Sequence, residues 1–232
     1  MTVDFRSRVR RGGLRGAALL AWLAEIPAGE RDAAFEQLLG IDDTPAQRPL
    51  GEGRMGYMPS GIAAIVRTVL DAPIGPDDVF VDLGSGLGKV AIAVHLLTGA
   101  RARGVEVQAD LATRARARAH DLALDVAFVD GDALDADVDD ATVFFLYLPF
   151  TGEVLDGVMK RLRVIAERKP IVVCALGLDL HACDWLVERP TQEFWLAIYD
   201  SRAGDLPPRV APAPPAWAAL GETIALERDA PA

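Results

Sequence analysis

The stretch Val79–Val90, read V-F-V-D-L-G-S-G-L-G-K-V, decides the fold of this 232-residue chain. A β-prone apolar run ends at Asp82, and three glycines follow at alternate positions, Gly84, Gly86 and Gly88. A segment with helical apolar periodicity comes next. This order predicts a buried strand, a tight glycine turn and a helix. Glycines let a ligand approach the main chain, so we expect a binding site at this turn.

Two phosphate-binding glycine motifs do not fit the turn. The P-loop G-x-x-x-x-G-K-[ST] fails because Leu83 stands at its first glycine and Val90 follows Lys89. The dinucleotide motif G-x-G-x-x-G, counted from Gly84, meets Lys89 where its third glycine belongs. The pattern acidic-x-G-x-G-x-G instead resembles the S-adenosylmethionine (SAM) loop of class I methyltransferases. SAM carries an ammonium and a sulfonium but no phosphate, so a carboxylate at the strand end suits it.

Two further acids follow predicted strands. Glu106 lies at the end of the predicted strand Ala102–Val107. A carboxylate at this spacing from a glycine turn accepts hydrogen bonds from both ribose hydroxyls in dinucleotide folds. Asp132 comes just after the predicted strand Val126–Val129, where an acid commonly binds the adenine amino group in the methyltransferase fold; Asp130 is the competing candidate.

Composition limits the partners and the compartment. The formal net charge is −10, so the chain lacks the basic footprint of tight nucleic-acid binding. Cys174 and Cys183 form no C-x-x-C motif, and His95, His120 and His181 are scattered, so we propose neither a disulfide framework nor a metal site.

No apolar run is long enough to cross a bilayer. Arg10-Arg11 before Ala17–Ala24 faintly resembles a twin-arginine export signal, but the apolar run is short and Glu25 follows it. We therefore expect a cytoplasmic protein with no membrane partner, and the residue usage suggests a bacterial one. The basic residues 1–16 fit either a solvated terminus or an arm that touches an acidic partner.

Strands alternate with helices along the rest of the chain, which predicts an α/β fold. We expect a Rossmann-like, seven-stranded, mostly parallel sheet with helices on both faces. Residues 1–55 would form an N-terminal helical cap and residues 56–232 the SAM-binding core. Ser60 is the expected N-cap of the helix that starts at Ile62. The further predicted helices are Leu14–Ile26, Ala33–Leu39, Ile62–Leu70, Asp110–Leu124, Val154–Ala166 and Leu180–Val187, and the further strands are Thr142–Leu146, Ile171–Leu176 and an antiparallel pair, Phe194–Tyr199 with Thr223–Leu226.

Two tyrosines are the candidates for orienting the methyl acceptor. Tyr57 precedes the helix that commonly covers the cofactor in class I methyltransferases, although it fits a packing role equally well. Tyr147 follows the fourth strand, where these enzymes place residues beside the transferred methyl. Base N-methyltransferases carry Asn/Asp-Pro-Pro-aromatic at this point. The sequence Leu146–Pro149 differs, which disfavours methylation of nucleobases.

Residues 56–175 resemble the cofactor half of the non-SET lysine methyltransferases of the disruptor-of-telomeric-silencing type. The resemblance rests on Val79–Glu106, on Tyr57 upstream of the first strand and on Val143–Glu153, read V-F-F-L-Y-L-P-F-T-G-E. Leu146-Tyr147 replaces an asparagine pair of that family, and its basic nucleosome-binding segment is missing. The resemblance therefore implies SAM binding but not histone-lysine specificity. It implies SAM contacts from Asp82, Gly84, Gly86, Lys89, Glu106 and Asp132, and Ser85, Gly88 and Ala133 in the same loops complete the predicted set.

The sequence thus predicts a SAM-dependent methyltransferase that acts on a small molecule and releases S-adenosylhomocysteine. Three alternatives stay open: a protein lysine N-methyltransferase, a non-catalytic SAM-binding regulator and, as the weakest, a nicotinamide-dependent oxidoreductase. The acceptor atom, the use of a general base and the oligomeric state do not follow from the sequence.

Overall fold

The computed structural model describes residues 4–46, 49–191, 193–203, 206–207 and 209–226. Within this part of the chain, seven strands form one sheet in the order β3-β2-β1-β4-β5-β7-β6. The strands β1 to β5 run parallel, and β7 runs antiparallel to both β5 and β6. The predicted Rossmann-like, mostly parallel α/β sheet is therefore confirmed. The strands are β1 Val79–Leu83, β2 Arg101–Glu106, β3 Val126–Asp130, β4 Val143–Tyr147, β5 Val172–Leu176, β6 Leu186–Arg189 and β7 Leu196–Ser201.

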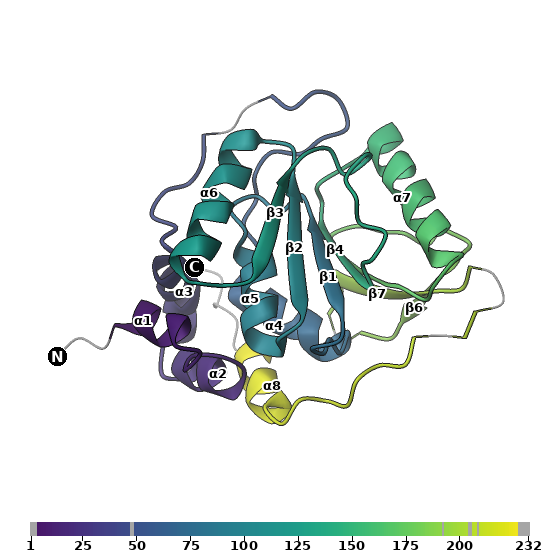
Figure 1. Cartoon of the computed structure of the whole chain (residues 1–232). Helices are drawn as coiled ribbons and strands as arrows, with labels where there is room; N and C mark the ends of the chain where they lie inside the picture. Colours follow the sequence, from purple (N-terminus) through teal and green to yellow (C-terminus); the bar gives the residue numbers. More distant parts are fainter. Residues whose placement is uncertain (1–3, 47–48, 192, 204–205, 208, 227–232) are drawn as a thin grey trace.

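Helices cover both faces of the sheet, as the alternating pattern predicts (Figure 1). One hydrophobic core lies between the sheet and most of the helices, and a second core lies under α7 on the opposite face. The helices are α1 Phe5–Arg10, α2 Ala17–Ala24, the short 3-10 helix η1 Ala28–Glu30, α3 Arg31–Leu39, α4 Ile62–Asp71, α5 Lys89–Thr98, α6 Ala109–Asp121, α7 Gly152–Ala166 and α8 Ala218–Leu226.

The central strand β1 shows why the sheet is buried on both sides. All five of its residues are buried. Phe80 packs into the core beneath α4 and α5, whereas Val79 and Val81 pack into the core beneath α7. This alternation follows from the two-residue repeat of a strand, and a parallel sheet covered on both faces needs apolar side chains in both directions.

The N-terminal helices pack against the core. Helix α2 contacts α5 and α8, and α3 contacts α1 and α4. Phe35 and Leu39 of α3 are fully buried and belong to the same core as the residues of α4 and α5. The division into a cap of residues 1–55 and a core of residues 56–232 stays a prediction.

Two predicted elements in the C-terminal part of the chain are wrong. The expected helix Leu180–Val187 is a turn that leads into β6, whose residues pair with β7. The expected strand Thr223–Leu226 is the last turn of α8, which packs on α4 and α2. In both segments the apolar pattern is too short to separate helix from strand, so tertiary contacts decide the outcome.

The predicted N-cap of α4 is also wrong, because Ser60 does not occupy that position. The cap position belongs to Gly61, which has no side chain to offer. Asp32 of α3 supplies the missing acceptor, because the Ile62 N–H donates a hydrogen bond to its Oδ1 at 2.8 Å. Helix α4 is therefore capped by a residue 30 positions away in the sequence.

None of the helices in the described residues combines the length and the apolar character that crossing a bilayer requires.

Candidate cofactor and acceptor site

A cavity opens at the carboxyl ends of β1, β2 and β4, the place where open α/β sheets bind ligands. The glycine turn between β1 and α5 forms its floor. Gly84 and Gly86 have φ angles of +87° and +52°, in the region that favours glycine. All predicted cofactor residues except Gly88 border this cavity, as do Tyr57 and Tyr147. We call it the first cavity.

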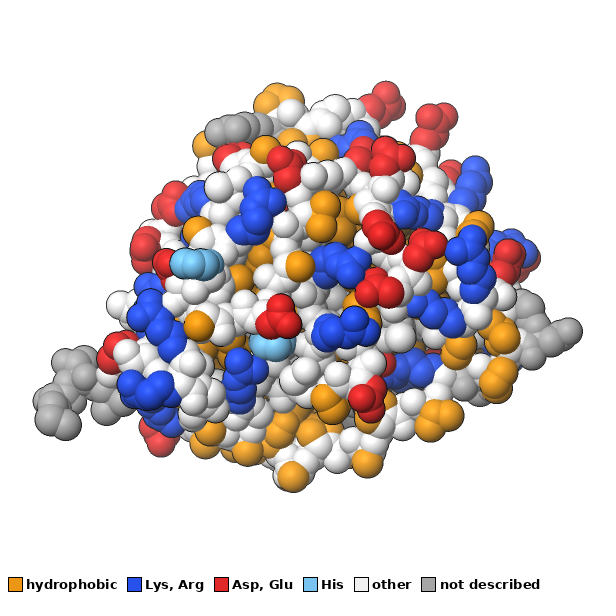
Figure 2. All heavy atoms as spheres, viewed as in Figure 1, with side chains coloured by type: hydrophobic (Ala, Val, Ile, Leu, Met, Phe, Trp, Pro, Cys, Tyr) orange, Lys and Arg blue, Asp and Glu red, His pale blue; other side chains and the backbone are white. Residues whose placement is uncertain are grey.

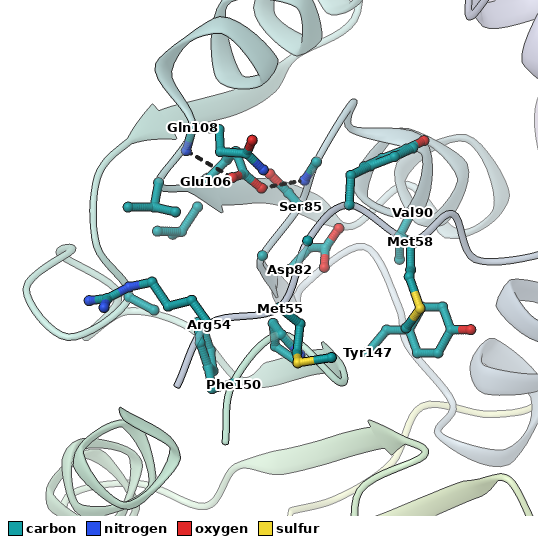
Figure 3. A pocket seen from close by; sticks show the side chains of 18 of the residues that line it. Arg54, Met55, Met58, Asp82, Ser85, Val90, Glu106, Gln108, Tyr147 and Phe150 are labelled. Atoms are coloured by element: carbon teal, nitrogen blue, oxygen red, sulfur yellow. Dashed lines mark hydrogen bonds between the residues drawn. The ribbon is translucent and has the colours of Figure 1, made fainter. Parts of the chain in front are cut away.

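Glu106 is held rigidly at the end of β2. Its Oε2 accepts a hydrogen bond from the Gly86 N–H at 2.8 Å, and its Oε1 accepts one from the Gln108 N–H at 2.9 Å (Figure 3). Burial raises the pKa of Glu106, whereas the two backbone donors act in the opposite direction. Each carboxylate oxygen can accept a second hydrogen bond, which is what a pair of ribose hydroxyls requires.

Asp82 is 2% exposed, and its Oδ2 has no hydrogen-bond partner among the described residues. Burial, with the nearby Glu106 carboxylate as the second cause, raises the pKa of Asp82 to about 8. Figure 3 shows Asp82 between Glu106 on one side and Tyr147 on the other. A buried carboxylate without a partner is costly, and a bound cation would remove that cost.

These observations fit SAM. Within the described part of the chain, Asp82 Oδ2 and the equally buried Ser85 Oγ have no hydrogen-bond partner. A Cβ at Gly84 would lie 2.6 Å from Pro149 Cβ, so a side chain at this position would meet the loop after β4. Glu106 would bind the ribose and Asp82 the ammonium. When bound, SAM supplies an electrophilic methyl group on a sulfonium.

Tyr57 lies directly over the glycine turn. A Cβ at Gly86 would stand 2.6 Å from two ring atoms of Tyr57, so only glycine allows this contact. Burial, followed by the charge of Glu36, raises the pKa of Tyr57 to about 12. The hydroxyl therefore stays protonated near neutral pH, which suits hydrogen-bond donation better than general-base catalysis.

Two predicted cofactor residues have other principal contacts. Lys89 borders the first cavity, but its ammonium forms ion pairs with Asp32 at 2.5 Å and with Glu36 at 2.7 Å. Gly88 faces away from the cavity, since a Cβ there would lie 2.5 Å from the ring of Phe128. Gly88 thus lets α5 pack closely on the sheet, and its predicted contact with the cofactor stays a prediction.

Residues 50–59 cross the mouth of the first cavity. Arg54 forms an isolated antiparallel bridge with Phe150, and the Met55 N–H donates to the Pro149 carbonyl at 3.1 Å. The Arg54 guanidinium forms an ion pair with Asp132, the predicted adenine partner. The first cavity has a volume of about 60 Å³, whereas a drug-sized ligand needs roughly 300–1,000 Å³. We therefore expect the segment 50–59 to move when SAM binds.

A second cavity, of about 540 Å³, adjoins the first and shares Ser60 and Tyr147 with it. Its walls are mainly apolar and come from the start of α4, the ends of β4 and β5, and the residue before β7. Leu148 in this wall has a φ of +43°, a strained conformation for a leucine and one that clusters at functional sites. The residues that line the second cavity include Ala28, Asp32, Ile62, Leu148, Leu176 and Trp195.

Several of these residues carry no sequence signal. Arg54 stands in a loop rich in glycine, and its approach to Asp132 depends on long-range packing. Trp195 and Leu148 reach the second cavity only because the carboxyl ends of β4 and β5 lie beside the start of β7. Gln108 could have been found, because it follows Glu106 by two positions at a strand end.

Comparisons with known proteins agree with this geometry. Residues 58–130, about a third of the chain, match the family described as "Histone methylation protein DOT1". An RNA methyltransferase from Salinibacter ruber, crystallised with S-adenosyl-L-homocysteine, has 28% sequence identity and a TM-score of 0.51, over 67% of this chain and 99% of that chain.

Geranyl diphosphate C-methyltransferase from Streptomyces coelicolor A3(2) is 23% identical, with a TM-score of 0.41 over 49% of this chain and 43% of that chain. No curated protein sequence matches the chain. The strand order, the glycine turn with its two buried carboxylates, the family match and the Salinibacter enzyme together identify the chain as a class I SAM-dependent methyltransferase.

Proposed function

We propose that this chain transfers a methyl group from SAM to a small molecule bound in the second cavity. The observation that carries the proposal is the shared boundary of the two cavities at Ser60 and Tyr147. An acceptor in a chamber of about 540 Å³ would meet the sulfonium end of SAM at this boundary. A volume of this size suits a small ligand, since such sites measure roughly 300–1,000 Å³.

Positioning supplies most of the catalysis in this account. Methyl transfer is an in-line displacement in which the acceptor approaches opposite the departing sulfur, so alignment removes much of the entropic barrier. Tyr147 at the boundary would orient the acceptor, and the protonated Tyr57 hydroxyl would donate a hydrogen bond to the bound ligands. The apolar walls would exclude water from the reacting atoms.

A nucleic-acid acceptor is the second candidate, because the Salinibacter protein is an RNA methyltransferase. Against it stands the net charge of −10. Basic and acidic side chains also alternate over the face shown in Figure 2, with no broad basic surface there. We therefore infer no nucleic-acid partner. A protein lysine acceptor and a regulatory, non-catalytic role are less favoured, since neither needs a chamber beside the methyl group.

We also infer a cytoplasmic, bacterial enzyme, because SAM is made in the cytosol and the residue usage is rich in Ala, Arg, Asp and Gly.

The fraction that receives a labelled methyl group distinguishes small-molecule, RNA and protein acceptors. The purified protein is incubated with methyl-labelled SAM and a bacterial extract, which is then separated into small molecules, RNA and protein. We expect label in the small-molecule fraction, dependent on the protein. Label confined to RNA or to protein would contradict the proposal and identify the acceptor class instead.

A further inference from the structure

We propose that Asp32 binds the protic group of the methyl acceptor in the second cavity and takes up its proton during transfer. The role of Asp32 rests on the small-molecule function proposed above. It restricts the methyl acceptor to a molecule that carries a hydroxyl or an amine on an apolar framework.

Asp32 is a half-buried carboxylate fixed from three elements. It lies on α3, and its Oδ1 accepts hydrogen bonds from the Lys89 ammonium of α5 at 2.5 Å and from the Ile62 N–H of α4 at 2.8 Å. A carboxylate held by two donors on one oxygen has a defined orientation, as preorganised sites require. The side chain of Asp32 is 46% exposed, yet these two donors hold its carboxylate in one orientation.

The second oxygen of Asp32 is available. Oδ2 accepts no hydrogen bond from the described residues, and it lies 3.3 Å from the position of a Cβ at Gly61. Gly61 borders the second cavity, and its neighbour Ser60 borders both cavities. Lys89 borders the first cavity and Asp32 the second, so their ion pair spans the boundary where methyl transfer would occur.

The surroundings of Asp32 select the acceptor chemistry. Among the described residues that line the second cavity, Arg31 is the other charged one, and its Nε donates to the carbonyls of Leu23 and Ile26. The remaining wall is mainly apolar. A fixed carboxylate oxygen in such a chamber binds an O–H or N–H group, whereas a carbon or thioether acceptor offers it no hydrogen bond.

The proton balance of the step requires such a group. The acceptor heteroatom attacks the methyl carbon with its lone pair, a heteroatom–carbon bond forms, and the carbon–sulfur bond breaks with its electron pair left on sulfur. The heteroatom then carries one proton too many. Asp32 Oδ2 takes this proton and releases it to solvent, while the ammonium of Lys89 keeps Oδ1 engaged.

The variant D32N tests this proposal, with E36Q as its matched control. The side-chain amide in D32N can still accept the Ile62 hydrogen bond but cannot take a proton, whereas Glu36 shares Lys89 with Asp32 but does not line the second cavity. We expect kcat on the purified labelled acceptor to fall about 100-fold or more in D32N. The SAM Kd should stay within about threefold in both variants, and E36Q should keep its activity within about threefold.

Two further measurements distinguish an Asp32 that accepts the proton from one that only holds Lys89 in place. Among the described residues, the charged groups near Asp32 are Arg31 and Glu36 on α3 and Lys89 on α5. Tyr147 of β4 lies on the same cavity wall, and α4 contributes the Ile62 N–H. The pH profile of kcat should therefore differ between the parental protein and D32N, because only the parental side chain can take up the proton. Mass spectrometry and NMR should place the new methyl on oxygen or nitrogen.

A carbon-methylated product, or parental turnover and pH profile in D32N, would overturn the role of Asp32. Equal losses in D32N and E36Q would also overturn it, since they would show that both acids only brace Lys89. If the parental protein labels no small molecule, both the proposed function and the role of Asp32 are contradicted. The parental protein is therefore assayed before the variants.

Discussion

Arg54 and Asp132 form a half-buried ion pair across the mouth of the first cavity. The pair joins the segment 50–59 to the loop after β3. Asp132 is the predicted partner of the adenine amino group, so this ion pair engages a carboxylate that we expect the cofactor to need. The ion pair and the bridge between Arg54 and Phe150 therefore hold the entrance closed in this structure.

Removing this ion pair should speed cofactor entry. In R54A we expect the association rate of SAM, measured by stopped-flow, to rise several-fold, because the segment opens more often. The free energy of unfolding should change by about 1 kcal/mol or less, as for other partly exposed pairs. R168A, which removes the exposed pair of Arg168 with Asp139, serves as the control. Equal association rates in R54A and R168A would show that the segment is not a barrier.

The raised pKa of Asp82 should make SAM binding dependent on pH. Below its pKa of about 8 the carboxyl is largely protonated, and the ammonium of SAM favours the ionised form. Affinity should therefore rise between pH 6 and 7.5, by up to about tenfold per pH unit, with release of a proton. Titration calorimetry in buffers of different ionisation enthalpy measures both. Affinity without a pH dependence would contradict the role of Asp82, and D82N should bind weakly at every pH.

The same carboxyl should lower the stability of the fold as pH rises toward its folded-state pKa of about 8. Its pKa is about 8 in the folded state against 3.8 in the reference state, so folding retains a proton that the unfolded chain releases. The free energy of unfolding then falls as pH rises from 4 to 8. D82N should be more stable at pH 8 by about 1 kcal/mol or more, which is roughly 2–4 °C in Tm for each kcal/mol. The exposed Asp77 gives the control D77N, and a Tm of D82N below that of D77N at pH 8 would refute the argument.

Glu106 should matter to cofactor affinity through its two free hydrogen-bonding positions. E106A should weaken SAM binding at least about tenfold, or 1.4 kcal/mol, if both ribose hydroxyls bind there. It also leaves the Gly86 and Gln108 N–H groups without their acceptor, so thermal unfolding must be followed in parallel. E106Q keeps one acceptor oxygen and should lose less affinity. Equal affinity of E106A and the parental protein in calorimetry would place the ribose elsewhere.

Alanine variants at Gly88 and Gly12 should distinguish the stability cost of a steric clash from the cost of backbone strain. Both have positive φ angles, +85° and +74°. A Cβ at Gly88 would lie 2.5 Å from the Phe128 ring, whereas a Cβ at Gly12 meets nothing within 4 Å. G12A should lose about 1–2 kcal/mol of stability from strain alone, and G88A about 1–3 kcal/mol more from the clash. Equal denaturation midpoints would mean that Phe128 moves aside without cost.

The central strand, glycine turn and helix could be predicted because each signal is local. The run that ends at Asp82, the alternate glycines and the apolar period of α5 agree with one another, and Glu106 stands at the required spacing. The mostly parallel sheet followed from the alternation of strands and helices.

The errors lie where the pattern is short or the contact is distant. The short apolar pattern of Thr223–Leu226 fits a strand and a helix equally well, and the packing of α8 on α4 decides for the helix. Two contacts join positions far apart in the sequence, namely the capping of α4 by Asp32 and the pairing of Arg54 with Asp132. Local sequence patterns therefore do not predict them. The second cavity could not be predicted for the same reason, because its walls come from elements that are distant in the sequence.

A structure of the protein crystallised with S-adenosylhomocysteine is the most direct measurement. The account predicts the ribose hydroxyls on Glu106, the amino-acid ammonium on Asp82 and the segment around Arg54 displaced from Asp132. A glycine turn left empty at saturating ligand, or one filled by a phosphate, would contradict it.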